Sequence, residues 1–156
     1  MEERTDGDPL EVAGENARRK ARAVEGELVV GVDTVVALDE RILPKPRDAA
    51  QAREWLRSLS GRTHRVVGGL CVVRAGREQV AVEITEVTFR ELVEGDVAWY
   101  VASGEWEGKA GGYAIQGRGA ALVERIAGDY LNVVGLPLAA LMRLVPELLQ
   151  MREFRA

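Results

Sequence analysis

The stretch ELVVGVDTVVAL, residues 27–38, decides the fold, because it is dense in β-branched residues and predicts a buried strand. Two polar residues, Asp33 and Thr34, lie inside this apolar run, and we expect them to break the strand. An unpaired carboxylate would be costly to bury at such a place. Asp33 is therefore a candidate catalytic residue, since strand ends often carry such groups. A turn that Asp33 caps through Thr34 explains the same pattern.

Helices are predicted on both sides of this strand. Asp8 is a suitable N-cap and Pro9 a suitable first helical residue, so we expect a helix over Pro9–Val24. Asp48 caps a second predicted helix through AAQAREWLRSL, which ends at Ser60 and Gly61.

A hairpin and several shorter elements follow. The strands THRVVGGLCVVR and EQVAVEITEVTFR flank Ala75-Gly76, a pair typical of a tight turn. The remaining expected elements are a helix near Gly95–Ser103, a strand near Ala120–Ile126 and a last helix after Pro137. Alternating helices and strands indicate the α/β class, and the absence of repeats or linkers indicates one domain over residues 1–156.

Composition excludes several classes of function. The net charge is −4, from 21 basic and 25 acidic side chains, which disfavours binding to a nucleic acid polymer but permits a small anionic ligand. The longest apolar stretch, Leu131–Met142, falls short of the roughly 20 residues that cross a membrane, so no membrane association is expected. A single cysteine, Cys71, excludes an internal disulfide and favours a cytoplasmic location.

Two further segments carry residues suited to anion binding. In LPKPRD, prolines on both sides restrict the backbone around Lys45, although a solvated loop lysine is the ordinary explanation. In GEWEGKAGGYAIQG, glycines permit close backbone approach around Lys109 and Gln116, but a glycine-rich loop alone is weak evidence. His64 is the only histidine, so neither a Ser-His-Asp triad nor a multi-histidine metal site is indicated. A structural role, or one in support of neighbouring site residues, is favoured.

Together these segments resemble a known family. The ordered series NARRKA, VVGVDTVV, LPKPRDAAQA, LSGRTHRVV, WEGKAGGYAIQG and IAGDYLNVVGLPL is similar to the Maf family of nucleotide pyrophosphatases, from about Glu3 to Leu149. The resemblance implies the Maf/ITPase-like α/β fold, a mixed twisted sheet flanked by helices with a substrate cleft between two lobes. Family members begin with a strand, a serine- and arginine-containing loop and a helix, which are not found in this sequence. The chain is therefore expected to be truncated at its N-terminus relative to the family, without the loop that holds the triphosphate.

The resemblance also implies an activity and a set of residues. The activity is hydrolysis of a nucleoside triphosphate, dTTP or UTP and related modified pyrimidine nucleotides, to the monophosphate and pyrophosphate. By position in the family pattern, Asp33 is the general base, Lys20 and Lys45 act with it, and Thr34, Lys109 and Gln116 bind substrate. Glu3 and Asp33 would ligate a divalent cation, Mg²⁺ or Mn²⁺, because hard cations favour carboxylate and phosphate oxygens.

One expectation concerns partners, and one alternative concerns function. Relatives often form homodimers, so a homodimer is possible here alongside the nucleoside triphosphate substrate. The alternative function is a nucleotide-binding regulator of cell division or septum formation that does not turn substrate over.

Overall fold

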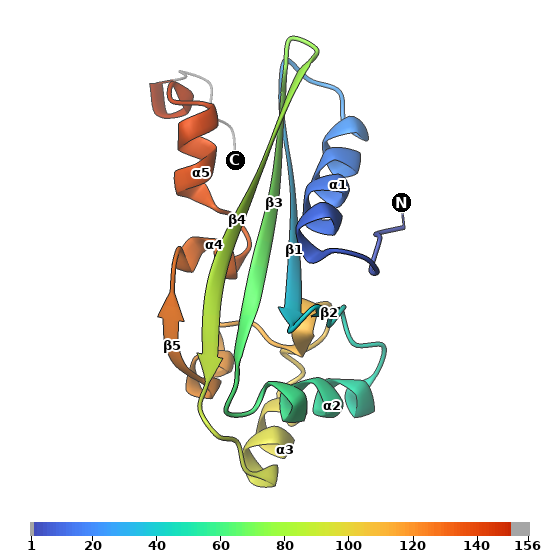
Figure 1. Ribbon diagram of the computed structural model, residues 1–156, viewed down its shortest axis with the longest axis vertical. Helices are drawn as coiled ribbons and strands as arrows, with labels where there is room; N and C mark the ends of the chain where they lie inside the picture. Colours follow the sequence, from blue (N-terminus) through green and yellow to red (C-terminus); the bar gives the residue numbers. More distant parts are fainter. Residues whose placement is uncertain (1, 151–156) are drawn as a thin grey trace.

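The protein is built around a five-stranded sheet with strand order β2-β1-β3-β4-β5 (Figure 1). The structure is a computed structural model that describes residues 2–150. The strands are β1 (Leu28–Leu38), β2 (Arg41–Ile42), β3 (Thr63–Arg74), β4 (Arg77–Phe89) and β5 (Val123–Ala127). The helices are α1 (Pro9–Arg22), α2 (Ala49–Leu59), α3 (Glu94–Ala102), α4 (Tyr130–Val134) and α5 (Leu138–Leu144), with short 3-10 turns η1 (Ala110–Gly112), η2 (Gly117–Leu122) and η3 (Leu148–Gln150). The expected α/β class is confirmed. The sheet was expected to be mixed, but every strand pairing among residues 2–150 is antiparallel.

The central strand β1 is continuous, so the expected break at its polar pair is wrong. Asp33 pairs with Gly69 and Thr34 with Gly68 in the ladder to β3. The hydrogen bonds between strands join backbone groups. A polar side chain therefore does not end a strand if the side chain itself has hydrogen-bond partners. Asp33 therefore lies in mid-strand.

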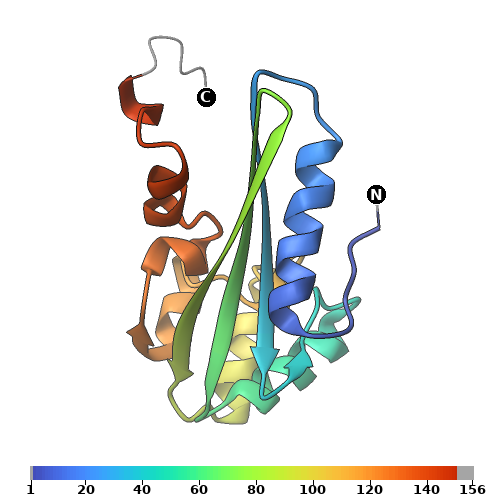
Figure 2. The same cartoon turned by 45° about the horizontal axis from the view of Figure 1, so that its top comes forward.

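Helices cover the two faces of the sheet (Figures 1 and 2). On β3, Val67 and Cys71 pack with α1, whereas Leu70 and Val72 pack with α5. Successive residues of a strand point to opposite faces, which places α1 and α5 on opposite sides. The largest apolar cluster lies elsewhere, at the end of the sheet where α2 and α3 pack.

Helix α1 lies unusually close to the sheet. Asp8 caps it by accepting hydrogen bonds from the backbone N–H groups of Leu10 and Glu11, as expected. A Cβ at Gly31 or at Gly69 would overlap the backbone of α1, so glycine at both positions permits this approach. The distance between helix and sheet is therefore set by the missing side chains.

Substitution of Gly69 by alanine should destabilise the protein by about 1–3 kcal/mol, because the added methyl group forces α1 away from the sheet. Gly95→Ala is the matched control, since a Cβ at Gly95 meets nothing within 4 Å. Urea unfolding of both variants measures the effect. Equal stability of the two variants would contradict the close packing of α1.

The other local predictions hold, and β2, α4 and the 3-10 turns are short additions to them. Asp48 caps α2, Gly61 has a positive φ of 64°, and the hairpin turns at Ala75 and Gly76 with φ of 47° and 74°. The short helix α4 was not predicted; Asp129 caps it by accepting from the N–H of Leu131.

One buried side chain anchors α4. The Asn132 amide nitrogen lies within hydrogen-bond distance of three acceptors, the carbonyl oxygens of Val66 and Glu83 and the hydroxyl of Thr85. Its two N–H groups are shared among them and fix α4 against β3 and β4. A Cβ at Gly68 would overlap the Asn132 oxygen, so the two residues are matched in size.

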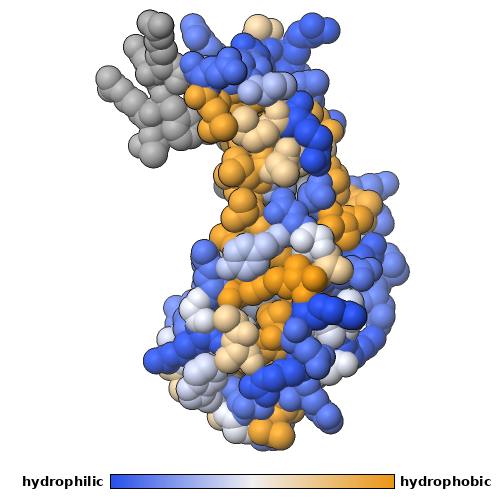
Figure 3. Space-filling view, turned by 90° about the vertical axis from the view of Figure 1, so that its left-hand side faces the viewer, coloured by the Kyte–Doolittle hydropathy of each residue, from blue (hydrophilic) through white to orange (hydrophobic). Residues whose placement is uncertain are grey.

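The side of the molecule that carries α4 and α5 displays apolar residues in a band between polar margins (Figure 3). Its exposed members in and next to α4 are Tyr130, Leu131, Val134, Leu136 and Leu138. Within residues 2–150, none of the helices has the length and apolar character needed to cross a membrane.

Candidate functional site

A cavity of about 270 Å³ lies at the edge of β1. Asp33 and Thr34 both line it, although neighbouring strand residues point to opposite faces. Within the described part of the chain, β2 pairs with β1 only at Ala37 and Leu38, so the preceding edge of β1 is open on that side. The cavity can therefore reach both faces of the strand around this edge.

Asp33 is the most buried charged group of the site, with only 6% of its surface exposed. One carboxylate oxygen accepts a hydrogen bond from the Lys20 ammonium at 2.6 Å, and the other accepts from the Asn16 amide at 3.0 Å. Both partners come from α1, where a spacing of four residues places them on one face. The close packing of α1 thus delivers the groups that allow this carboxylate to be buried.

Glu3 joins two lysines of the site. Its carboxylate contacts the ammonium of Lys20 at 2.9 Å and that of Lys45 at 3.0 Å. The hydrogen bond from Lys20 holds the pKa of Glu3 below its ordinary value of 4.5, against the opposing effect of partial burial. Burial alone would lower the pKa of Lys20, but the hydrogen bonds to Asp33 and Glu3 raise it above 10.5. Glu3 is therefore ionised and Lys20 protonated at neutral pH.

The proline-flanked loop carries Lys45 and is held at two points. The Trp55 indole N–H donates to the carbonyl oxygen of Pro44 at 3.0 Å. Leu43 donates its N–H to Val36 of β1 and accepts a hydrogen bond from the N–H of Gly111. The loop is thereby fixed between β1 and the glycine-rich segment.

The glycine-rich segment brings Lys109 and Gln116 to the cavity wall. The N–H of Ala114, between them, donates to the Tyr100 hydroxyl at 3.0 Å. After Gln116, the N–H of Arg118 donates to the Glu105 carboxylate at 3.1 Å. These anchors restrain the backbone on which both side chains are mounted.

The inner wall of the cavity includes Tyr113, which is tied to the only histidine. His64 is 1% exposed, and its Nε2 shares a hydrogen bond of 2.6 Å with the Tyr113 hydroxyl. Phe89 packs edge-on against both rings. Burial lowers the pKa of His64 from 6.5 to about 4, so this histidine is neutral at physiological pH. The structural role favoured for His64 agrees with this environment.

Because folding keeps His64 neutral, the unfolded chain binds its proton at a higher pH than the folded protein does. Stability should therefore fall as the pH drops from 6.5 towards 4, by about 3 kcal/mol from this residue. A non-titrating His64→Gln variant should be less stable than the parent at pH 7, and the gap should narrow as the pH is lowered through this range. Urea unfolding at several pH values tests this; a gap independent of pH would contradict a buried neutral histidine.

The structure brings together all seven residues that the family resemblance selected. Six line the large cavity: Lys20, Asp33, Thr34, Lys45, Lys109 and Gln116. Glu3 lines an adjoining cavity of about 140 Å³, which Asp33, Thr34 and Lys45 share. Asn16, which contacts Asp33 and lines the adjoining cavity, had been given no role from the sequence. Its place four residues before Lys20, within the NARRKA motif, is the signal that could have indicated it.

The donor atoms suit a hard cation. Glu3 and Asp33 both contact the same Lys20 ammonium, so their carboxylates converge on one point that already accommodates positive charge. Among residues 2–150 no group of three or more His, Cys, Asp or Glu side chains could hold a metal. Mg²⁺ is commonly bound by one or two carboxylates, while phosphate oxygens and water fill its remaining coordination positions.

Fold and site define an α/β protein with a lysine-lined cavity around a buried carboxylate, which is suited to a phosphorylated small molecule. The chain belongs to the family described as Maf-like protein, which it matches over residues 1–148.

Three relatives, each named dTTP/UTP pyrophosphatase, illustrate the relationship. The protein from Pyrococcus furiosus is 46% identical over 88% of this chain and 75% of its own length. The one from Deinococcus radiodurans is 48% identical over 92% of this chain and 76% of its own length. The one from Thermococcus gammatolerans is 48% identical over 92% of this chain and 79% of its own length.

Proposed function

We propose that this protein is a nucleoside triphosphate pyrophosphatase that hydrolyses dTTP and UTP to the monophosphate and pyrophosphate. One observation carries the proposal: the buried carboxylate of Asp33 lies in a cavity that is lined by Lys20, Lys45 and Lys109. The names of the relatives agree with this chemistry and supply the choice of base.

The residues divide into two tasks. Phosphoryl transfer places negative charge on phosphate oxygens, and the three lysines can neutralise it in a partly enclosed site. Asp33 acts as general base that orients a water molecule and accepts its proton. Hydrogen bonds from Asn16 and Lys20 fix the direction of the Asp33 carboxylate before substrate arrives.

Glu3 and Asp33 would hold a divalent cation, Mg²⁺ or Mn²⁺, which supplies further neutralisation of the phosphate charge. The ionised state of Glu3, maintained by Lys20 and Lys45, keeps its oxygens available as ligands. Thr34 and Gln116 are the proposed contacts to the nucleotide base, since both line the large cavity.

Asp33→Asn should lower kcat for pyrophosphate release by about 100- to 10,000-fold, the usual contribution of a general base. Asparagine keeps the size of the side chain and an oxygen that can accept from Asn16 or Lys20, so the fold should persist. The assay compares release from dTTP, UTP, dCTP and ATP with Mg²⁺ or Mn²⁺, with circular dichroism as a check on folding. A folded variant with unchanged kcat would refute this mechanism.

Binding of dTTP by the parent protein without any pyrophosphate release would instead favour the regulatory alternative. Isothermal titration alongside the same assay separates these two results.

Gln116→Glu should change base preference. An amide donates and accepts, which suits the mixed imide edge of thymine or uracil, whereas a carboxylate only accepts and pairs with the amino group of cytosine. The ratio of kcat/KM for dCTP to that for dTTP should rise about tenfold, the value of one good hydrogen bond.

Because both substrates carry the same triphosphate, the ratio cancels the general repulsion that a new negative charge causes. Gln79→Glu is the control, since Gln79 is an exposed glutamine on β4 outside the cavity. An unchanged ratio in the Gln116 variant would remove this residue from base recognition.

A further inference from the structure

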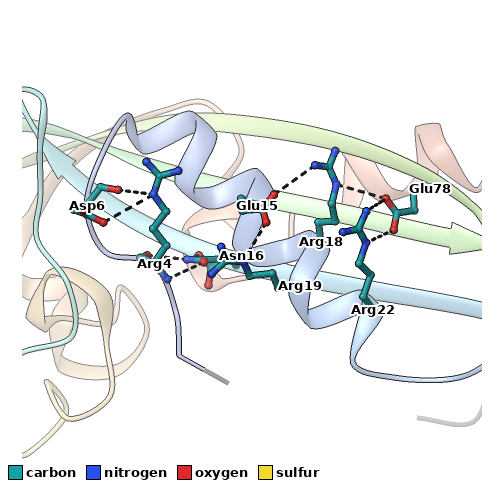
Figure 4. Close-up of polar contacts among 9 residues, drawn as sticks. Arg4, Asp6, Glu15, Asn16, Arg18, Arg19, Arg22 and Glu78 are labelled. Carbon is teal, nitrogen blue, oxygen red and sulfur yellow. Dashed lines mark hydrogen bonds and ion pairs between the residues drawn. The ribbon is translucent and has the colours of Figure 1, made fainter.

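Asn16 connects two parts of the site that are distant in sequence. Figure 4 shows its contacts with Arg4. Its side chain is 3% exposed on α1. Its amide oxygen accepts from the backbone N–H of Arg4 at 2.9 Å, and its amide nitrogen donates to the backbone carbonyl of Arg4 at 2.9 Å. The same nitrogen donates to Asp33 at 3.0 Å. Both N–H groups of this amide are therefore used, one on each part of the site.

The segment held in this way has no regular secondary structure of its own. Residues 2–5 lie outside any helix or strand, yet residues 3–5 form one wall of the smaller cavity. The Asn16 side chain pairs with both the N–H and the carbonyl group of Arg4, as a neighbouring strand would. Glu3 directly precedes Arg4 in the chain. The position of the Glu3 carboxylate thus depends on a side chain that also contacts Asp33.

We propose that Asn16 is a positioning residue that sets the Glu3 carboxylate against Asp33, and that it acts on turnover through Glu3. The inference rests on the proposed function, because it assigns Glu3 and Asp33 to one reaction. Only an amide of this length offers one acceptor and two donors here. Aspartate at position 16 keeps the acceptor for the Arg4 N–H but loses both donors.

A double-mutant cycle between Asn16 and Glu3 tests the proposal in the chain of residues 1–156. We expect Asn16→Ala and Glu3→Gln each to lower kcat/KM for pyrophosphate release by about 10- to 100-fold, as misplacement of a catalytic group does. If Asn16 acts mainly through Glu3, the loss in the double variant should be at least about threefold smaller than the product of the two single losses. It should still exceed the loss in Glu3→Gln, because Asn16 also donates a hydrogen bond to Asp33. Fold changes that multiply would overturn the proposal, since they would show that Asn16 acts independently of Glu3.

Val12→Ala controls for a general loss of stability. Val12 is fully buried on α1, one turn before Asn16, and packs in the cluster with Val35 and Val67. Its substitution weakens the same helix without removing a contact to Arg4 or Asp33, so its effect should multiply with that of Glu3→Gln. If Val12→Ala were coupled to Glu3→Gln as strongly as Asn16→Ala is, any weakening of α1 would disturb Glu3. That result would overturn the specific role of Asn16.

Hydrogen exchange at the backbone amide of Arg4 tests whether Asn16 holds this segment, and the measurement does not depend on enzymatic activity. In the parent protein this N–H should be protected although it lies in an irregular segment near the start of the chain, and Asn16→Ala should remove the protection. Should Asn16→Ala fail to fold, Asn16→Ser replaces it in the cycle, because serine is small and polar but too short to reach both Arg4 and Asp33. An unprotected Arg4 amide in the parent protein overturns the inference, whereas a protected amide in a protein that releases no pyrophosphate overturns the proposed function instead.

Discussion

A carboxylate buried in the middle of an apolar strand is the constraint on which the arrangement of this protein depends. Asp33 is 6% exposed, and an ionised carboxylate in such surroundings is strongly unfavourable unless it is paired and hydrogen-bonded. Lys20 supplies the opposite charge and Asn16 the second hydrogen bond. Both partners belong to α1, so the position of that helix decides whether the carboxylate can exist there at all.

The position of α1 in turn follows from what the strands lack. Gly31 and Gly69 leave no Cβ beneath the helix, and its backbone occupies the space. A helix held farther away by ordinary side chains could not bring the short amide of Asn16 within hydrogen-bond distance of Asp33. The packing of α1 on the sheet therefore determines the hydrogen bonding of the carboxylate in the cavity. Gly31 and Gly69, which do not line the cavity, contribute to both.

Local signals in the sequence predicted most elements, because helix caps and tight turns depend on a few neighbouring residues. Asp8 and Asp48 cap the helices they were expected to cap, and Ala75-Gly76 forms the hairpin turn. The continuity of β1 through Asp33 could not be predicted in this way, because the groups that satisfy the carboxylate come from another element. Helix α4 is only five residues long, too short to show a clear helical period.

The site shows the same division between local pattern and tertiary contact. The family resemblance selected Asp33, the lysines and Gln116 by motif order, and the fold gathers these side chains around one cavity. Asn16 has no reactive group, and its importance comes from the two partners that it joins across the fold. Residues 2–5 form an irregular segment, which gains a defined position only through contacts such as those of Asn16 with Arg4. Under the proposal, Asn16 therefore belongs to the site as much as the Glu3 carboxylate that it positions.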